Sequence, residues 1–211
     1  STPPTKTSDA LMALDIKTGK ILWVTQVTSG DAYNSGCGNN NGQCPAENGP
    51  DFDFGSSPML VNADWHGKPR RLLLQANRNG FFYVLDRVTG EFLLGQPFAK
   101  KITWASGIDA KGRPILIPGQ EPSVEGTKTC PAASGATNWM STAYSSATGL
   151  FYVMVRESCA IFTKSDAWWE PGKSFYRGGA RLALGDPPQK FLRAIDIQTG
   201  KIAWEIPQIG G

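Results

Sequence analysis

Two aspartates separated by one phenylalanine lie in the stretch GPDFDFGSSP, residues 49–58. Asp51 and Asp53 are each followed by a phenylalanine, and glycines and prolines surround them. A carboxylate held among aromatic rings can accept a proton during a reaction, whereas the same residues in a solvated loop would do no chemistry. The stretch alone favours the solvated loop, so the choice between the two depends on the rest of the chain.

Four cysteines and one histidine are the other residues that could react or bind a metal. Cys37 and Cys44 lie in a polar run, whereas Cys130 and Cys159 lie in less polar segments far from it. The spacings do not match a zinc site, and His66 lies in DWHGKP, which indicates an exposed hairpin tip. We therefore predict two disulfides rather than free thiols. A Cys37–Cys44 bond would order the polar run, and disulfides indicate an oxidising compartment, a periplasm or the cell exterior.

Composition narrows the class of protein. The chain has 211 residues, 40% of them hydrophobic and only 18% charged, which indicates a globular fold rather than disorder. The net charge of +3 is spread without a basic stripe, which argues against nucleic-acid binding. No apolar run is long enough to span a membrane. The first ten residues, STPPTKTSDA, have no apolar core of a signal peptide, so we expect either a cytosolic protein or a mature form or piece of a longer chain.

A repeated motif organises the chain. Each copy has a Thr-Gly turn between two apolar runs, which predicts a β-hairpin with glycine at positive φ. Asp15, Asp86 and Asp196 end the first strand of three copies, where a carboxylate can accept backbone N–H groups, so we interpret them as structural. The copies are LMALDIKTGKILW (11–23), FYVLDRVTGEFLL (82–94), AYSSATGLFYV (143–153) and RAIDIQTGKIAW (193–204).

The strands group into four-stranded units. Short apolar segments joined by tight turns, and no amphipathic helix of ordinary length, predict an all-β chain of propeller blades with a tryptophan in the outer strand. The expected strands are 58–63, 70–76, 81–86 and 91–96, then 140–145, 150–156, 191–196 and 201–206, with 11–15 and 20–26 from an earlier blade. We predict one partial propeller domain over 1–211, with a blade end at 11–26, a blade at 57–96 and a blade at 138–206 that contains an insertion, 157–190.

The motifs ALDIKTGKILW and AIDIQTGKIAW resemble the tryptophan-docking motif of pyrroloquinoline-quinone (PQQ) dehydrogenases. Three further segments, in order, are similar to parts of quinoprotein alcohol dehydrogenases that carry the active-site aspartate, a basic residue on the cofactor and an Asn-Trp pair near the quinone. They are GPDFDFGSSPML, ANRNGFFYVLDRVTG and TCPAASGATNWMSTAYSSATGLFYV. The resemblance runs from about residue 11 to residue 206. GPDFDFG after a cysteine-bearing loop also resembles polyvinyl alcohol dehydrogenases of the same superfamily.

The resemblance implies a PQQ- and calcium-dependent alcohol dehydrogenase that oxidises an alcohol to an aldehyde or ketone and passes electrons to a quinone or cytochrome c. Asp53 would be the general base and a calcium ligand. Arg78 would donate to quinone oxygens rather than be an exposed turn arginine. Asn138 and Trp139 would lie near the quinone edge; the alternative is a strand-start amide and a core indole.

Other implications concern the site's surroundings. Cys159 falls where the family places the disulfide partner of Cys130. Many relatives carry a second acidic residue at the position of Gly55, and Asp51 either compensates for it or caps the loop. The insertion 157–190, with Trp168, Trp169, Phe175 and Tyr176, either walls a substrate entry or is a structural cover.

The family fold is an eight-bladed ring, of which this chain matches roughly two and a half blades. We therefore expect a part of a propeller that retains neither PQQ nor calcium tightly by itself. We also expect its open blade faces to self-associate or to pair with the remainder of the propeller.

Two other classes of protein share some of these features. A non-catalytic PQQ-like propeller, a binding or scaffold module, would share the tryptophan motif but would not need Asp53, Arg78 and Asn138 together. A glycosidase needs two carboxylates that flank a sugar, and Asp51 and Asp53 are too close in sequence for that.

Overall fold

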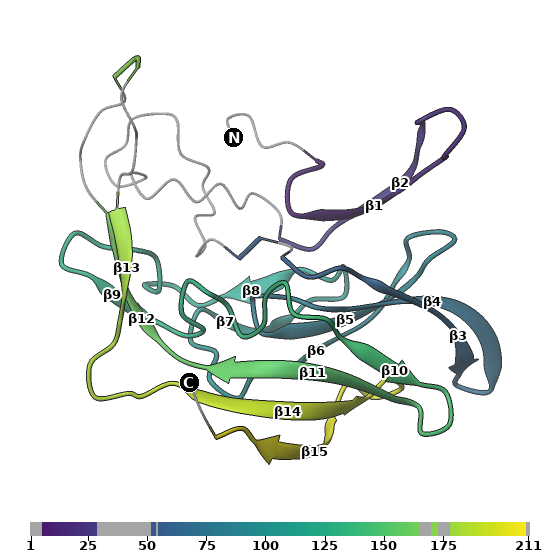
Figure 1. Cartoon of the computed structure of the whole chain (residues 1–211). Coiled ribbons are helices and arrows are strands. Elements are labelled where there is room, and N and C mark those ends of the chain that lie inside the picture. Colours follow the sequence, from purple (N-terminus) through teal and green to yellow (C-terminus); the bar gives the residue numbers. More distant parts are fainter. Residues whose placement is uncertain (1–5, 29–51, 54, 165–169, 173–177, 210–211) are drawn as a thin grey trace.

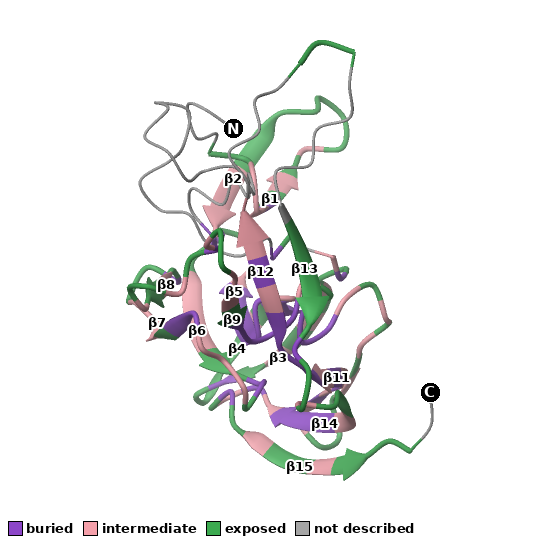
Figure 2. Ribbon diagram, turned by 90° about the vertical axis from the view of Figure 1, so that its left-hand side faces the viewer, coloured by how far each residue is buried: buried purple, intermediate pink, exposed green. Residues whose placement is uncertain are grey.

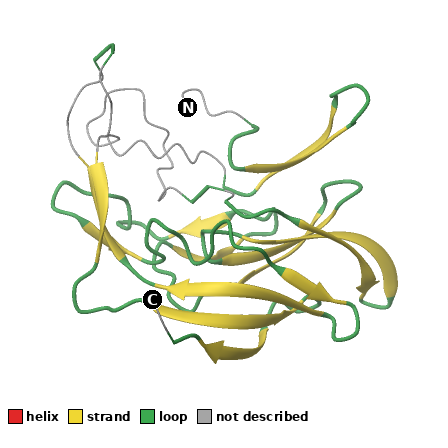
Figure 3. Cartoon of the chain, viewed as in Figure 1, coloured by secondary structure: helices red, strands yellow, loops and turns green. Residues whose placement is uncertain are grey.

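A computed structural model describes residues 6–28, 52–53, 55–164, 170–172 and 178–209. The predicted Cys37–Cys44 disulfide, Asp51 and the aromatic residues named in the insertion lie outside the described residues. The described part is built of β-strands and contains no helix, so the predicted all-β class is confirmed (Figure 3). It also contains no helix long and apolar enough to cross a membrane.

Two antiparallel four-stranded sheets form the body of the chain. Each strand pairs with its sequence neighbour in the sheet, the up-and-down order of a propeller blade. The first sheet contains β3 (Met59–Trp65), β4 (Lys68–Ala76), β5 (Phe81–Asp86) and β6 (Phe92–Pro97). The second contains β10 (Ala143–Ser145), β11 (Leu150–Glu157), β14 (Gln189–Asp196) and β15 (Ile202–Pro207).

A third element, the hairpin of β1 (Ala10–Leu14) and β2 (Ile21–Gln26), precedes these sheets. In Figure 1 the hairpin, the first sheet and the second sheet follow one another in chain order. The side chain of Trp23 in β2 donates to the carbonyl of Arg87, in the turn after β5 (3.2 Å). The tryptophan of one repeat therefore packs on the Thr-Gly turn of the next.

The three turns share one hydrogen-bond pattern. Oδ1 of Asp15, Asp86 and Asp196 accepts the backbone N–H groups two and three residues later, at 2.8–3.2 Å. The structural interpretation of these aspartates is confirmed. Gly90 follows in one such turn at a φ of 76°, and a Cβ there would lie 2.7 Å from the Trp23 ring. Only glycine allows this approach.

The two four-stranded sheets pack face to face over one apolar core. Phe82 of β5 contacts Phe151 of β11, with ring centroids 5.0 Å apart. Val84, Val153 and Ile195 belong to the same buried cluster. Figure 2 shows that the peripheral strands β13 and β15, in contrast, are largely exposed. The core therefore lies between the sheets and fixes the loops at their ends.

Two smaller sheets were not predicted. A hairpin pairs β7 (Ala105–Ile108) with β8 (Pro114–Leu116). A three-stranded sheet joins β9 (Thr127–Thr129), β12 (Ala160–Lys164) and β13 (Gly178–Leu182). In this three-stranded sheet, β12 and β13 come from the described ends of the insertion, and β9 comes from the segment before β10.

Candidate active site

The turn between β4 and β5 carries Arg78. Asn77 and Asn79 on either side are fully buried, and the Asn77 carboxamide oxygen accepts the backbone N–H of Asn79 (2.9 Å). Gly80 closes the turn by donating to the carbonyl of Asn77 (3.1 Å). Because the turn is buried and hydrogen-bonded within itself, it holds the backbone of Arg78 in one position.

Asp53 lies directly against this arginine. The Nη1 atom of Arg78 is 2.9 Å from Oδ2 of Asp53. The arginine side chain is 15% exposed, whereas the aspartate side chain is 61% exposed. The alternative of an exposed turn arginine is therefore wrong. In this ion pair, the carboxylate of Asp53 is accessible to solvent, whereas the guanidinium of Arg78 is mostly buried.

The segment Cys130–Asn138, which we call the site loop, covers the other side of Arg78. The carbonyl of Ala133 accepts a short hydrogen bond from Nη2 of the arginine. The backbone N–H of Ala136 donates to the Arg78 carbonyl (2.9 Å). Gly135 at a φ of 79° touches the arginine so closely that a Cβ there would lie 2.6 Å from the Arg78 Cβ. Arg78 is thus enclosed by backbone.

A disulfide anchors the start of the site loop. Cys130 and Cys159 are bonded, which confirms this predicted pair, and both are buried. Next to the bond, the N–H of Ala132 donates to the carbonyl of Ser158 (2.8 Å). The site loop is therefore tied to the end of β11 at one side and to Arg78 at the other.

Asn138 is the last residue of the site loop, and Trp139 follows it. The Asn138 carboxamide donates to the carbonyl of Ser134 (3.1 Å). Its Oδ1 faces Gly55, where a Cβ would lie 2.7 Å from that oxygen and 3.2 Å from Cδ of Arg78. The structure thus brings together Asp53, Arg78 and Asn138. The Trp139 side chain is 80% exposed, so the alternative of a core indole is wrong.

Sequence reasoning did not identify the parts that hold these three side chains. The carbonyls of Ala133 and Ser134 carry no side-chain signal, because any residue supplies a carbonyl. The one available signal for the site loop was the small-residue run PAASGA, in which Gly135 takes a conformation that favours glycine.

The donor set suits an anionic, oxygen-rich planar cofactor. Arg78 supplies a guanidinium whose Nε is buried without a hydrogen-bond partner among the described residues. Asn138 adds a carboxamide, and Trp139, which follows it in the chain, has an exposed side chain. A quinone bearing carboxylates fits such a set, because guanidinium and amide groups bind carboxylate and carbonyl oxygens.

Fewer residues are available to bind a metal ion. Within the described ranges, no three His, Cys, Asp or Glu side chains gather closely enough to hold an ion. Among the residues that the structure describes, Asp53 offers an exposed carboxylate beside Arg78. It fits as one oxygen ligand of a hard cation whose other ligands come from outside these residues.

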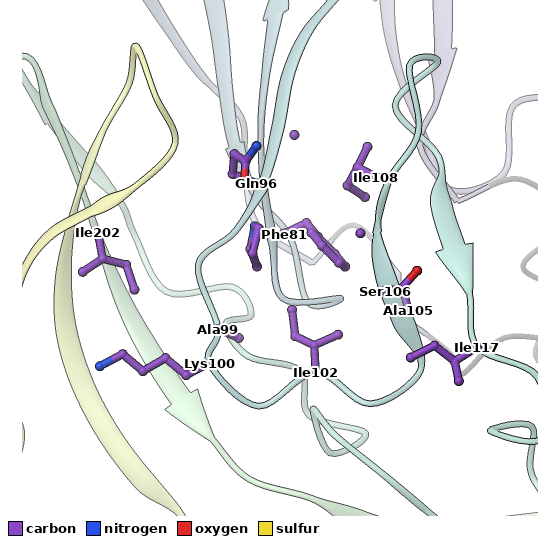
Figure 4. A pocket seen from close by; sticks show the side chains of 13 residues that line it. Phe81, Gln96, Ala99, Lys100, Ile102, Ala105, Ser106, Ile108, Ile117 and Ile202 are labelled. Carbon is purple, nitrogen blue, oxygen red and sulfur yellow. The ribbon is translucent and has the colours of Figure 1, made fainter.

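A separate cavity of about 770 Å³ lies between β6, β7 and β15. Figure 4 shows Phe81, Ile102 and Ile108 around it, with Lys100 at its edge. None of Asp53, Arg78 and Asn138 lines it. The cavity is therefore distinct from the Asp53–Arg78 site.

Comparison with known proteins gives consistent results. Residues 43–97 match the PQQ family model described as "Glucose/ethanol/alcohol dehydrogenase, beta-propeller domain". The chain is 35% identical to the quinoprotein alcohol dehydrogenase PedH of Pseudomonas putida over 93% of its own length and 32% of that protein. It is 30% identical to a lanthanide-dependent methanol dehydrogenase of Methylorubrum extorquens over 96% of its own length and 33% of that protein.

Solved structures agree with this result. A europium-containing methanol dehydrogenase superposes with a TM-score of 0.77 at 28% identity, covering 95% of this chain and 33% of that one. The quinohemoprotein alcohol dehydrogenase of Comamonas testosteroni gives 0.76 at 28% identity, covering 96% and 29%. The chain thus spans about a third of the length of the relatives it matches. The predicted resemblance to quinoprotein alcohol dehydrogenases and the propeller fold are confirmed.

Proposed function

We propose that this chain, a homologue of the propeller region of quinoprotein alcohol dehydrogenases, contributes the proton-accepting side of a PQQ-dependent alcohol dehydrogenase site. The observation that carries the proposal is the contact between Arg78 and Asp53, 2.9 Å, with the carboxylate open and the guanidinium covered. A non-catalytic scaffold, the alternative class, would not need a fixed carboxylate–guanidinium pair at a loop junction.

The chemistry follows from these residues. Bound PQQ supplies an acceptor for the two electrons that leave the alcohol. Asp53 accepts the proton of the alcohol O–H, so that the carbon–hydrogen bond breaks with its electron pair as the carbonyl forms. Arg78 orients the carboxylate through Oδ2 and, with Asn138, would hold oxygens of the quinone. Trp139 would lie along the quinone edge.

We propose calcium as the metal, with Asp53 as one ligand. Some relatives use a lanthanide, as the methanol dehydrogenase of Methylorubrum extorquens does by name. A trivalent ion favours a second nearby carboxylate, and the position two residues after Asp53 is Gly55. No side chain fits there without moving Asn138, since a Cβ would lie 2.7 Å from its Oδ1. The space at Gly55 therefore supports a divalent ion.

The compartment and the electron acceptor belong to the same proposal. The Cys130–Cys159 disulfide supports an oxidising compartment, so we propose the periplasm or the cell exterior. There a cytochrome c or a quinone would take the electrons. The substrate is an alcohol, and polyvinyl alcohol belongs in the screen because of the resemblance of the GPDFDFG stretch.

The experiment uses the natural gene product that contains these 211 residues. It is freed of cofactors, then supplied with PQQ and calcium, separately and together, and offered primary, secondary and polymeric alcohols with an artificial electron acceptor. We expect acceptor reduction only with both additions. Arg78→Leu should abolish PQQ binding, whereas Arg87→Leu, an arginine that bonds to Asn62 outside the site, should not. Equal PQQ binding by wild type and Arg78→Leu would contradict the proposal.

A further inference from the structure

We propose that Ser56 and Gln75 are positioning residues that clamp the Asp53 loop to the Arg78 turn. The effect on catalysis rests on the proposed function, but the geometric effect does not. The hydrogen bonds of the two side chains join them to each other and to the carbonyl of Ala76, so they would act on Asp53 and Arg78 through the backbone.

The clamp is a compact set of hydrogen bonds. The carboxamide nitrogen of Gln75 donates to the carbonyl of Ser56 (2.9 Å) and lies 2.7 Å from its hydroxyl oxygen. The Ser56 hydroxyl in turn donates to the carbonyl of Ala76 (2.6 Å). Gln75 is 1% exposed and Ser56 is 7% exposed, so these bonds are shielded from water.

The clamp joins the two segments that carry the site, the loop with Asp53 and the turn with Arg78. Ser56 comes shortly after Asp53, and Gln75 shortly before Arg78. The Gly55 N–H donates to the Asp53 carbonyl (2.9 Å), so the residue directly before Ser56 is bonded to Asp53. The bonds from Ser56 to the end of β4 therefore hold the Asp53 carboxylate in position relative to Arg78, which follows β4.

A polar residue at this point of β4 is unfavourable for packing alone. Leu72, Leu73, Leu74 and Ala76 around Gln75 in β4 are all buried and apolar. The Oε1 atom of Gln75 is buried and has no partner among the described residues, which carries a desolvation cost. An apolar side chain would avoid that cost, so the glutamine is explained by what its nitrogen holds.

The test measures the position of Arg78 directly. Ser56→Ala and Gln75→Met remove the clamp, and the matched control is Ser158→Ala, because Ser158 is equally buried but its hydroxyl has no partner among the described residues. Arginine modification by phenylglyoxal is followed by mass spectrometry, with Arg87 as reference within each protein. We expect the Arg78 rate to rise at least about tenfold in both clamp variants, because one hydrogen bond is worth about that factor and each variant removes at least two. The modification rate of Arg78 should be unchanged in Ser158→Ala, and the rate of Arg87 should be unchanged in every variant.

Two results would overturn the clamp. One is an unchanged Arg78 rate in both clamp variants. The other is an equal rise at Arg78 and Arg87, which would mean general loosening of the fold. Ser56→Thr keeps the hydroxyl, so it should restore the slow rate, and failure to do so would also count against the clamp.

Kinetics of the active enzyme separate the clamp from the proposed function. Ser56→Ala should lower kcat for alcohol oxidation with little change in KM, because the carboxylate is misplaced while PQQ and substrate still bind. Ser56→Thr should recover kcat. If Arg78 labelling behaves as expected but the wild type oxidises no alcohol, the clamp stands and the proposed function fails. An unchanged kcat in both clamp variants of an active enzyme would refute the positioning role.

Discussion

At the scale of single residues, a buried ion pair within the second large sheet also binds the segment that follows the first. Arg193 of β14 is fully buried and bonds to Glu157, which is 3% exposed. The two oxygens of Glu157 also accept the backbone N–H groups of Lys100 (2.8 Å) and Lys101 (2.9 Å), in the segment after β6. A charge buried in this way is tolerable only while its partner is present. The pair therefore holds the segment after one sheet to the strands of the next.

Glu157→Leu should lower the free energy of unfolding by about 3–5 kcal/mol, because Arg193 would lose its buried carboxylate and keep only the partly exposed Glu205. The N–H groups of Lys100 and Lys101 would also lose their acceptor. The matched control is Glu91→Leu, whose ion pair with Arg70 is exposed at 3.3 Å and should cost at most about 1 kcal/mol. Denaturant unfolding of both variants gives the comparison. Equal losses would show that the buried pair has no special role.

One acidic residue near this pair, Glu205, also makes the stability of the fold depend on pH. The hydrogen bond from Lys100, followed by that from Arg193, holds the pKa of Glu205 below its ordinary value. A carboxyl group with a lowered pKa in the folded state stabilises the fold above its unfolded pKa and loses that contribution as pH falls. This contribution is therefore complete at neutral pH and disappears in acid.

The residue scale also shows what the sequence contained. Asp53, Arg78 and Asn138 were identified through a resemblance, and the structure brings them together. The clamp was not identified, because one serine and one glutamine form no recognisable motif, and their contact joins a loop to a strand end. Only the fold shows that these two polar groups are buried together.

At the scale of elements, one packing contact recurs between successive repeats. Trp23 packs on Gly90, and Leu94 with Gln96 packs on Gly200. In each case the outer strand of one repeat reaches the turn glycine of the next. A Cβ added at Gly19, the turn glycine of the first hairpin, would instead meet nothing within 4 Å.

This difference makes Gly90 and Gly19 a matched pair. Both have positive φ, 76° and 68°, so alanine strains the backbone at each. Gly90→Ala additionally forces the Trp23 ring away, so we expect it to cost about 1–3 kcal/mol more than Gly19→Ala. Thermal or denaturant unfolding measures the two losses. Equal losses would contradict the repeat contact.

The disulfide is the second element-scale feature. Cys130 and Cys159 are 29 residues apart, and their bond closes a loop that includes the site loop. In the chain-entropy model, a loop of this length stabilises the fold by about 3–4 kcal/mol. The double variant Cys130→Ala/Cys159→Ala should lose that amount in unfolding experiments. A loss no larger than that of a single surface substitution would contradict the expectation.

Local patterns explain which elements the sequence predicted. Strands β3–β6, and the pairs β10–β11 and β14–β15, are joined by Thr-Gly or polar turns between close neighbours, so their pairing is local. The pairing of β11 with β14 spans the insertion instead. The sheet of β9, β12 and β13 joins three segments that are distant in sequence, in the order β13-β12-β9. Its strands have three or five residues, too short for a clear alternation of apolar and polar positions.

At the scale of the whole molecule, apolar side chains remain exposed at the two outer elements. Ile16, Ile21 and Leu22 are exposed at the β1–β2 hairpin, and Trp204 and Ile206 are exposed on β15. β15 is also the edge of its sheet, with backbone groups available for pairing. Surfaces of this kind mark association.

We therefore expect the isolated 211-residue polypeptide to self-associate. Light scattering over a concentration series should show species larger than a monomer. Leu22→Lys together with Ile206→Lys should shift the population towards monomer, because charges disfavour burial of these faces. A monodisperse monomer at every concentration would contradict the prediction.

The central claim is that Asp53 and Arg78 belong to a site where an alcohol gives up its electrons to PQQ. The most direct measurement is the absorbance of PQQ bound to the natural gene product, recorded after rapid mixing with an alcohol and without any other acceptor. The account predicts conversion of the oxidised to the reduced spectrum in the wild type, and conversion about 10²–10⁴-fold slower in Asp53→Asn. Asp53→Asn keeps the shape of the side chain but removes the base. Equal rates in the two proteins, or no spectral change with any alcohol, would contradict it.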